Sequence, residues 1–462
     1  MKTMLFKAAA IAALLSSGGA ALAAESSPAA VTGRWDAVLS RNGTEIPFRL
    51  DIKSDGGTLQ GVFYNGFEPY DGTTSATFKD GKLVLGVEHY LTTINATLEN
   101  GKLTGTAVAQ NRESSADYAF QAVRHVDPPA SPAQAPSIAG TWLIPLEAPS
   151  SKGEKAFRLI VEQRGDEVAA SILRIDGDTG AYTGRFKDGR WVLSHFDGGR
   201  PGILVVTPRP DGALEVRQRV DRPGASAAAT TVSVSAKAGG DYATEATPDG
   251  RYAPTLTAYR AEAAQAKGLP APDDFLTHTT ARDPNEIFAF NYPDASGKLV
   301  SNDDPRFKGK VVLAIVTGTW CPNCHDEAQY LVELDKKYRD KGLAIVALDF
   351  EEPEQQGGLN RAKAFIKQYG VKYTYLFPGS PAQMWEKVPQ LQHLDTWPAT
   401  VFIDRDGKVN AVHSGFASPA SGEFNTQLKQ EFTARIEQLL AKPPQSRSAS
   451  ASQGAIQQAK LD

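Results

Sequence analysis

The chain has 462 residues and two cysteines, which stand three positions apart in the segment Trp-Cys-Pro-Asn-Cys at residues 320–324. In thiol–disulfide exchange, a cysteine thiolate attacks a disulfide and forms a mixed disulfide, which a second thiol close by then releases. With this spacing, Cys324 can close a small disulfide ring with Cys321. The pair therefore predicts a redox site in which Cys321 attacks and Cys324 resolves.

The residues around the cysteines predict a strand that passes directly into a helix. The apolar, β-branched run at residues 311–316 indicates a buried strand. Apolar residues then recur at helical spacing, at Ala328, Leu331, Leu334 and Tyr338, before Gly342 ends the pattern. Cys321 would lie at the helix N-terminus, where free backbone N–H groups and the helix dipole lower the pKa of a thiol.

The N-terminal residues predict an exported protein. Lys2 and Lys7 precede a short apolar stretch at residues 8–15, and the small residues that follow end in Ala-Leu-Ala at 21–23. This is the pattern of a secretory signal peptide, and the apolar stretch is too short to span a bilayer. The mature protein is expected to be periplasmic or otherwise exported and soluble, with no stable membrane insertion.

Two other roles for the cysteine pair are disfavoured. A structural disulfide across so short a loop would restrict the unfolded chain little, so it would contribute little stability. A zinc site would need further Cys or His ligands at matching spacing, and only His325 lies nearby in the sequence. We therefore expect no metal and no cofactor.

The charge of the chain argues against nucleic acid as a partner. Lys and Arg number 49 and Asp and Glu 53, for a net charge of −4, and the two signs are interspersed. No basic stripe or basic amphipathic segment stands out.

The N-terminal half contains a duplication. Four pairs of short motifs keep an offset near 108 residues, and they begin at Gly33 and Gly140, Phe48 and Phe157, Phe78 and Phe186, and Asn100 and Asp211. In each copy, Asp-Gly or Asn-Gly turns separate short alternating runs, which is typical of β-hairpins. The sequence therefore predicts two all-β modules, each a barrel or a sandwich.

Composition and turn residues predict the following division of the chain. The parts are a signal peptide at 1–23, a first β-module at 30–125, a proline-rich linker at 126–137, a second β-module at 138–240, a connector at 241–282 with a helix at 259–267, an α/β domain at 283–442, and a disordered tail at 443–462.

In the α/β domain, predicted strands and helices alternate. The predicted strands are at 311–316, 343–348 and 375–377, hairpins at 288–300 and 400–413, and helices after the cysteines, at 361–369, 381–388 and 424–440. Three motifs, at 307–313, 318–324 and 397–407, resemble the TlpA/ResA-like family of exported thioredoxin-fold thiol–disulfide oxidoreductases. The fold class is thus a C-terminal thioredoxin fold preceded by two duplicated all-β modules.

The resemblance implies further features of the site. It implies that Pro398 follows a cis peptide bond and packs against the reactive disulfide. Trp320 is expected to pack beside the thiol and exclude water. The family likeness also implies a disulfide reductase that acts on disulfide-containing client proteins and is supplied by a membrane electron donor.

Proton transfer to Cys324 has several candidates. Ile315 stands where thioredoxins carry a buried aspartate, and the resemblance offers Glu351 or Glu352 instead, although a solvated surface glutamate is the alternative for both. His325 could act as a cation that lowers a thiol pKa, or it could lie on the helix surface. Asp326 and Glu327 would add negative charge, which opposes a thiolate at Cys321 and favours a reductant over a strong oxidant.

Two other functions remain open. A peroxiredoxin-like peroxidase is disfavoured, because Ala314 and Gly318 replace the proline and threonine expected before its reactive cysteine. Alternatively, the protein is mainly a client-binding scaffold whose β-modules dock a partner. No His/Cys/Asp cluster in those modules has a catalytic pattern, so we interpret them as docking or spacing elements.

Overall fold

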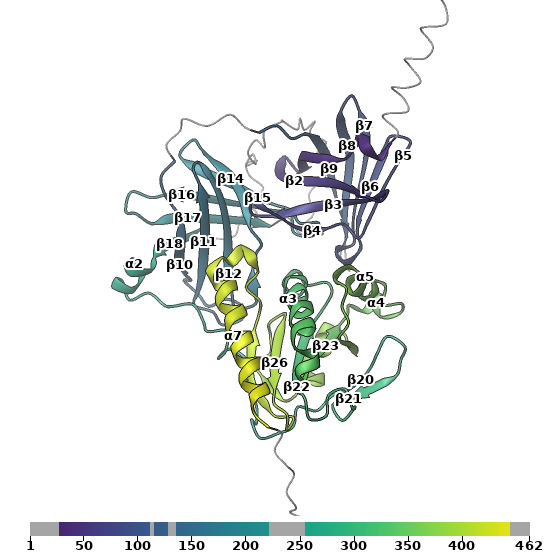
Figure 1. Cartoon of the computed structure of the whole chain (residues 1–462). Helices are drawn as coiled ribbons and strands as arrows, with labels where there is room; N and C mark the ends of the chain where they lie inside the picture. Colours follow the sequence, from purple (N-terminus) through teal and green to yellow (C-terminus); the bar gives the residue numbers. More distant parts are fainter. Residues whose placement is uncertain (1–26, 111–114, 128–134, 221–254, 444–462) are drawn as a thin grey trace, which may run out of the picture.

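The computed structural model describes residues 27–110, 115–127, 135–220 and 255–443. The predicted signal peptide, most of the predicted linker and nearly all of the predicted disordered tail therefore lie outside the described residues. Figure 1 shows two all-β modules side by side, with an α/β domain below both of them. Within the described parts, no helix is long and apolar enough to cross a membrane.

Module 1 is a curled antiparallel sheet. Its strands are β1 (Gly33–Arg41), β2 (Thr44–Asp55), β3 (Thr58–Asn65), β4 (Glu68–Gly72), β5 (Ser75–Lys79), β6 (Lys82–Val87), β7 (Thr92–Glu99), β8 (Lys102–Gln110) and β9 (Ser115–Arg124). They are ordered β4-β3-β2-β1-β9-β8-β7-β6-β5, so β4 and β5 form its two edges.

Module 2 repeats this order and closes into a barrel. Its strands are β10 (Gly140–Pro145), β11 (Ala156–Arg164), β12 (Glu167–Arg174), β13 (Gly177–Asp178), β14 (Tyr182–Lys187), β15 (Arg190–His195), β16 (Gly202–Pro208), β17 (Leu214–Val220) and β18 (Leu256–Arg260). Closure occurs because β12 pairs with both β11 and β14.

The ends of the two modules correspond residue by residue. The indole of Trp35 donates to the Val31 carbonyl at 2.8 Å, and the indole of Trp142 donates to Ile138 at 2.9 Å. In each module an arginine of the last strand lies over that indole, Arg124 at 4.0 Å and Arg260 at 3.9 Å from the ring centroid.

The structure corrects the predicted C-terminal boundary of module 2. Because β18 pairs with β10 and β17, module 2 extends to Arg260 and does not end near residue 240. The predicted helix at 259–267 is correspondingly shorter, since α2 spans Ala261–Ala266. A signal was present in the sequence: Phe-Gln-Ala-Val-Arg at 120–124 has its counterpart in Leu-Thr-Ala-Tyr-Arg at 256–260.

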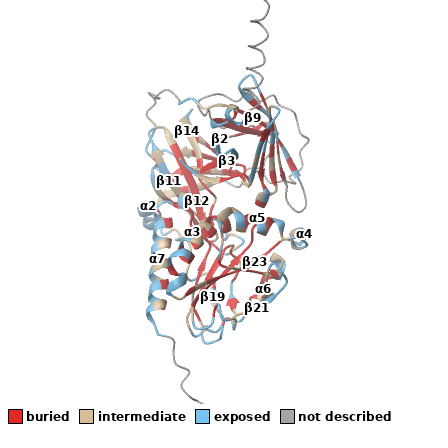
Figure 2. Ribbon diagram, turned by 45° about the vertical axis from the view of Figure 1, so that its right-hand side comes forward, coloured by how far each residue is buried: buried red, intermediate tan, exposed pale blue. Residues whose placement is uncertain are grey.

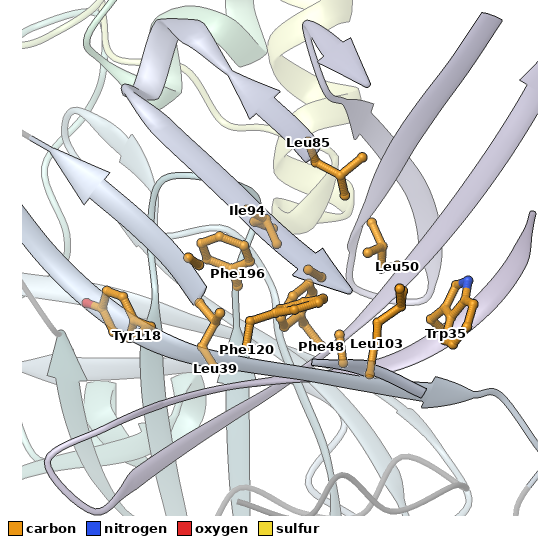
Figure 3. Packing of buried hydrophobic residues seen from close by; sticks show 14 of the residues in the cluster. Trp35, Leu39, Phe48, Leu50, Leu85, Ile94, Leu103, Tyr118, Phe120 and Phe196 are labelled. Carbon is orange, nitrogen blue, oxygen red and sulfur yellow. The ribbon is translucent and has the colours of Figure 1, made fainter. Parts of the chain in front are cut away.

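The core of module 1 includes residues of module 2. Phe196, which follows β15, is 2% exposed and belongs to this core together with Ile203 and Val205. Figure 3 shows Phe196 and Phe48 in this core, and their ring centroids lie 4.8 Å apart. The ring centroid of Phe196 lies 5.5 Å from that of Phe63. Module 2 has a core of its own and in addition supplies Phe196, Ile203 and Val205 to the core of module 1.

The C-terminal domain has the thioredoxin fold. Its central sheet contains β22 (Val311–Thr317), β23 (Leu343–Phe350), β24 (Thr374–Gly379), β26 (Ala399–Ile403) and β27 (Val409–Ser414), in the order β24-β23-β22-β26-β27. Pairing is parallel from β22 to β24 and antiparallel through β26 and β27. The smaller strands are β19 (Thr280–Ala281), β20 (Asn291–Pro293), β21 (Leu299–Ser301) and β25 (Leu391–Gln392).

Helices cover this sheet. They are α3 (Pro322–Tyr338), α4 (Pro353–Gln356), α5 (Asn360–Tyr369), α6 (Met384–Lys387) and α7 (Glu423–Ala441). Figure 2 shows buried residues through the central strands and exposed ones along the outer face of α7. The strands and helices that the sequence predicted around the cysteines are thus confirmed, within a few residues at their ends.

Candidate redox site

The two cysteines lie where β22 passes into α3. The strand ends at Thr317, Cys321 caps the helix, and Pro322 is its first residue. Proline suits that position because it has no N–H to leave unpaired. Both thiols are free and buried, Cys321 being 5% and Cys324 1% exposed. The predicted position of Cys321 at a helix N-terminus is confirmed.

Pro398 lies beside the first cysteine. The Trp397–Pro398 peptide bond is cis, as the resemblance implied. The sulfur of Cys321 lies 3.4 Å from the carbonyl oxygen of Trp397, within hydrogen-bonding distance. The chain then enters β26 at Ala399.

Trp320 and Trp397 form an aromatic rim next to Cys321. Their ring centroids are 5.1 Å apart in an edge-to-face arrangement. The indole N–H of Trp320 donates to the Phe350 carbonyl at 2.9 Å, which fixes the ring against the end of β23. Trp320 is only partly buried, so it borders the thiol without sealing it from solvent.

Cys324 lies deeper than Cys321. Burial and the neighbouring Cys321 raise the pKa of the Cys324 thiol well above its ordinary value. A resolving thiol in this environment needs a nearby group that accepts its proton.

Glu327 stands three residues after Cys324 on α3 and is a candidate for this role, which the sequence reasoning did not propose. It is 1% exposed and accepts a hydrogen bond from the Thr400 hydroxyl. Burial raises its pKa to about 8. The available signal was helical spacing, because positions i and i+3 share a helix face.

Glu351 and Glu352, which follow β23, are not the solvated surface glutamates that the sequence left open. Glu351 is buried and accepts from the Thr319 backbone N–H at 3.0 Å and from the Thr319 hydroxyl. Glu352 forms an ion pair with Arg361 at 2.9 Å. Asp349 is fully buried, and burial together with the adjacent Glu351 raises its pKa well above the ordinary value.

His325 is not a helix-surface residue, and its environment opposes a cation. The imidazole is 2% exposed, with Nε2 2.8 Å from the Thr319 carbonyl and Nδ1 2.8 Å from the Tyr369 hydroxyl. Burial lowers its pKa well below the ordinary value, as does the neighbouring His89. A neutral imidazole at neutral pH is therefore expected, and the proposed cationic role is not supported.

Three groups meet where module 1 contacts this helix. Ligand atoms of Asp71, His89 and His325 lie within 4.8 Å of one another, a set that could hold a metal ion. The Tyr369 hydroxyl already bridges two of them, since it also donates to Asp71 at 2.7 Å. Asp71, His325 and Tyr369 thus form a hydrogen-bonded junction between module 1, α3 and α5, whereas neither ring nitrogen of His89 has a hydrogen-bond partner among the described residues.

Both β-modules contact the first turns of α3. From module 1, the Tyr70 hydroxyl donates to Asp326 at 2.7 Å. From module 2, the Asp176 carbonyl accepts from the Asn323 amide at 2.8 Å, and Asn323 lies between the two cysteines. The modules therefore form part of the surroundings of the redox site.

Comparison with known proteins identifies the C-terminal region. Residues 270–428 match the Redoxin family. ResA, a thiol–disulfide oxidoreductase of Bacillus thuringiensis subsp. konkukian, is 35% identical over 122 residues, which is 26% of this chain and 62% of that protein. The thioredoxin-like protein YneN of Bacillus subtilis is 29% identical over 126 residues, or 27% of this chain and 69% of that protein.

Among solved structures, a putative DsbE thiol:disulfide interchange protein of Chlorobium tepidum is 23% identical. It aligns with 33% of this chain and 98% of its own, with a TM-score of 0.27. The chain spans less than two thirds of the length of the ResA protein. The Redoxin match lies in the C-terminal half of the sequence. Residues 270–428 are a Redoxin domain with the thioredoxin fold of ResA-like thiol–disulfide oxidoreductases.

Proposed function

We propose that the protein is an exported thiol–disulfide oxidoreductase that reduces disulfides of client proteins through Cys321 and Cys324. The observation that carries this proposal is the position of Cys321. Its sulfur lies at the N-terminus of α3 and against the carbonyl of Trp397, which precedes the cis proline. A client chain beside Pro398 would bring its disulfide to this sulfur, as an extended strand brings side chains to a sheet edge.

The reaction proceeds in two exchanges. The Cys321 thiolate attacks one sulfur of the client disulfide, and the other client sulfur leaves as a thiolate and takes up a proton. Cys324 then loses its proton and attacks the Cys321 sulfur, which frees the second client thiol. The client gains two electrons and two protons, and the enzyme is left with a Cys321–Cys324 disulfide.

Glu327 is the proposed proton acceptor for the second exchange. Its pKa of about 8 is close enough to neutrality for the carboxyl to exchange a proton at working pH. Trp320 limits water beside the attacking sulfur. A membrane electron donor, in line with the family, would reduce the disulfide again.

Single-turnover kinetics test this proposal. The full chain is reduced with a dithiol, freed of it, and mixed with bis(2-hydroxyethyl) disulfide, a small neutral substrate. The wild type should release thiol, Cys321→Ser should release none, and Cys324→Ser should accumulate a mixed disulfide on Cys321 that mass spectrometry detects. Unchanged activity of Cys321→Ser would exclude the mechanism.

A further inference from the structure

A cleft joins the redox motif to module 2. It has a volume of about 450 Å³. On one side it is lined by the redox motif and both tryptophans, Trp320, Cys321, Pro322, Asn323 and Trp397. On the other side module 2 contributes Arg174, residues 176–179, Tyr182, residues 199–201 and Gln218, which together are called the module 2 wall. A volume of this size is typical of a small-ligand pocket.

The module 2 wall is fixed in place by bonds to the C-terminal domain. Asp178 accepts from the Ser418 backbone N–H at 2.7 Å, the Ser418 hydroxyl at 3.0 Å and the Ser421 hydroxyl at 2.6 Å. Gly177 forms a bridge with Phe416. Leu173 is fully buried in the core of the C-terminal domain. The module 2 wall is therefore held in place by contacts with the C-terminal domain and is not a loop that lacks such contacts.

The wall restricts what can reach Cys321. The Asn323 amide, two residues from Cys321, is bonded to the wall at the Asp176 carbonyl. Cys321 itself is only 5% exposed. A narrow, flexible chain fits such a cleft, whereas a disulfide held inside a rigid protein surface would meet module 2 before it reached the sulfur.

Some charged side chains in the module 2 wall form ion pairs, and others form hydrogen bonds with neutral groups. Arg200 pairs with Asp197 at 2.6 Å, and Asp176 pairs with Lys152 at 2.6 Å. Arg174 instead donates to the neutral amide of Gln218 at 2.8 Å, and its buried Nε has no hydrogen-bond partner among the described residues. No ion pair of Arg174 is formed within the part of the chain that the structure describes.

We propose that this cleft is a substrate site for a disulfide on a flexible chain that carries a carboxylate next to the sulfur, with Arg174 as the group that binds the carboxylate. This inference rests on the proposed function and specifies its substrate class. Arginine suits the task, because its planar fork of N–H donors matches a carboxylate. The carboxylate can belong to an acidic residue of a client segment or to a small disulfide such as glutathione disulfide.

The experiment uses the pre-reduced full chain and matched pairs of substrates. One pair is a mixed disulfide of a short peptide in which the residue beside cysteine is Asp or Asn. The other pair is glutathione disulfide and its tetraethyl ester, in which all four carboxylates are esterified. Charge-assisted hydrogen bonds of this kind predict that Arg174→Gln slows the carboxylate substrates by roughly 10-fold and the neutral ones by less than about 2-fold.

Two further variants keep the test decisive. Arg209→Gln, which removes an exposed arginine of module 2 that pairs with nearby Asp211, should change neither rate. Gln218→Glu keeps Arg174 but gives it an internal carboxylate, so it should slow the same substrates as Arg174→Gln does. Circular dichroism and thermal melting check that each variant is folded.

The outcomes separate the two proposals. Equal slowing of both members of a pair, or no slowing, would overturn the carboxylate site. A rigid protein with a surface disulfide that reacts as fast as the Asp peptide would overturn the size restriction. Failure of the reduced wild type to react with bis(2-hydroxyethyl) disulfide would instead refute the proposed function. Loss of rate with the peptide but not with glutathione disulfide would assign the site to client segments.

Discussion

The two β-modules have the same strand order but differ in how the sheet ends. In module 2, β12 pairs with both β11 and β14, so the barrel is closed. In module 1, β4 and β5 remain as edges, and the side chain of Phe196 from module 2 enters the core instead. An open sheet and a closed barrel therefore arise from one repeated pattern.

The difference shows what each module contributes. The loop after β6 and the loop after β15 occupy the same place in the repeat. In module 1 this loop places His89 against His325, with ring centroids 4.2 Å apart. In module 2 it places Phe196 in module 1. Each module thus uses its equivalent loop to contact a neighbouring unit: module 1 contacts the C-terminal domain, and module 2 contacts module 1.

The largest expected effect comes from removal of the shared core residue. Phe196→Ala should destabilise the protein by about 3–5 kcal/mol, because it deletes a fully buried aromatic side chain and leaves a cavity. Urea denaturation followed by tryptophan fluorescence measures the change. Phe67→Ala, at a partly exposed turn of module 1, should cost less than about 1 kcal/mol. If both substitutions lowered the free energy of unfolding equally, the stability of module 1 would not depend on the Phe196 side chain from module 2.

A smaller effect is expected at the contact between module 2 and the redox domain. A Cβ on Gly177 would lie 2.4 Å from the Phe416 carbonyl, at a φ of +121° that disfavours side chains. Gly177→Ala should therefore cost about 2 kcal/mol and speed reaction of Cys321 with bulky disulfides, because the wall moves away. Gly189→Ala, at φ +81° with nothing near its Cβ, controls for backbone strain. Stopped-flow kinetics with folded and unfolded disulfide-containing proteins measure the rate of reaction at Cys321. Equal rates for Gly177→Ala and Gly189→Ala would contradict the prediction.

The last effect concerns pH at the contact between module 1 and α3. Burial raises the pKa of Asp326 to about 7 from its ordinary 3.8, while the Tyr70 hydroxyl donates to it. Between these values the folded protein keeps a proton that the unfolded chain has lost, so stability falls as pH rises from about 4 to 7. The slope is at most about 1.4 kcal/mol per pH unit for one group.

Asp326→Asn should reduce that slope, and Glu327 should account for part of what remains, up to about pH 8. Urea midpoints between pH 5 and 8, with both cysteines kept reduced, measure it. Glu333→Gln, at an exposed position of the same helix, should leave the slope unchanged. An unchanged slope in Asp326→Asn would show that this carboxyl is ionised in the folded protein.

The raised pKa values also remove one argument for a reductant, since Asp326 and Glu327 oppose a thiolate less than their sequence positions suggested.

The sequence predicted those parts of the molecule that depend on local patterns. The apolar run at 311–316 and the helical spacing after Cys324 placed the cysteines at a strand-to-helix corner, and the family motifs placed Pro398 beside them. The duplication was also visible, because hairpin turns require Asn-Gly or Asp-Gly at fixed positions. β18, the last strand of module 2, was missed because a long segment that includes residues 221–254 separates it from β17.

Only the tertiary structure decided which groups are buried together. Glu351, His325 and Glu327 could equally have been surface residues of their elements, since a single helix or strand does not reveal what packs against it. Burial by both β-modules and by the C-terminal sheet shifts their pKa values or fixes their hydrogen bonds. The same applies to Arg174, whose place in the cleft depends on how module 2 docks. Sequence thus determined the chemistry of the cysteine pair, and long-range packing determined its surroundings, because desolvation depends on contacts that local patterns do not encode.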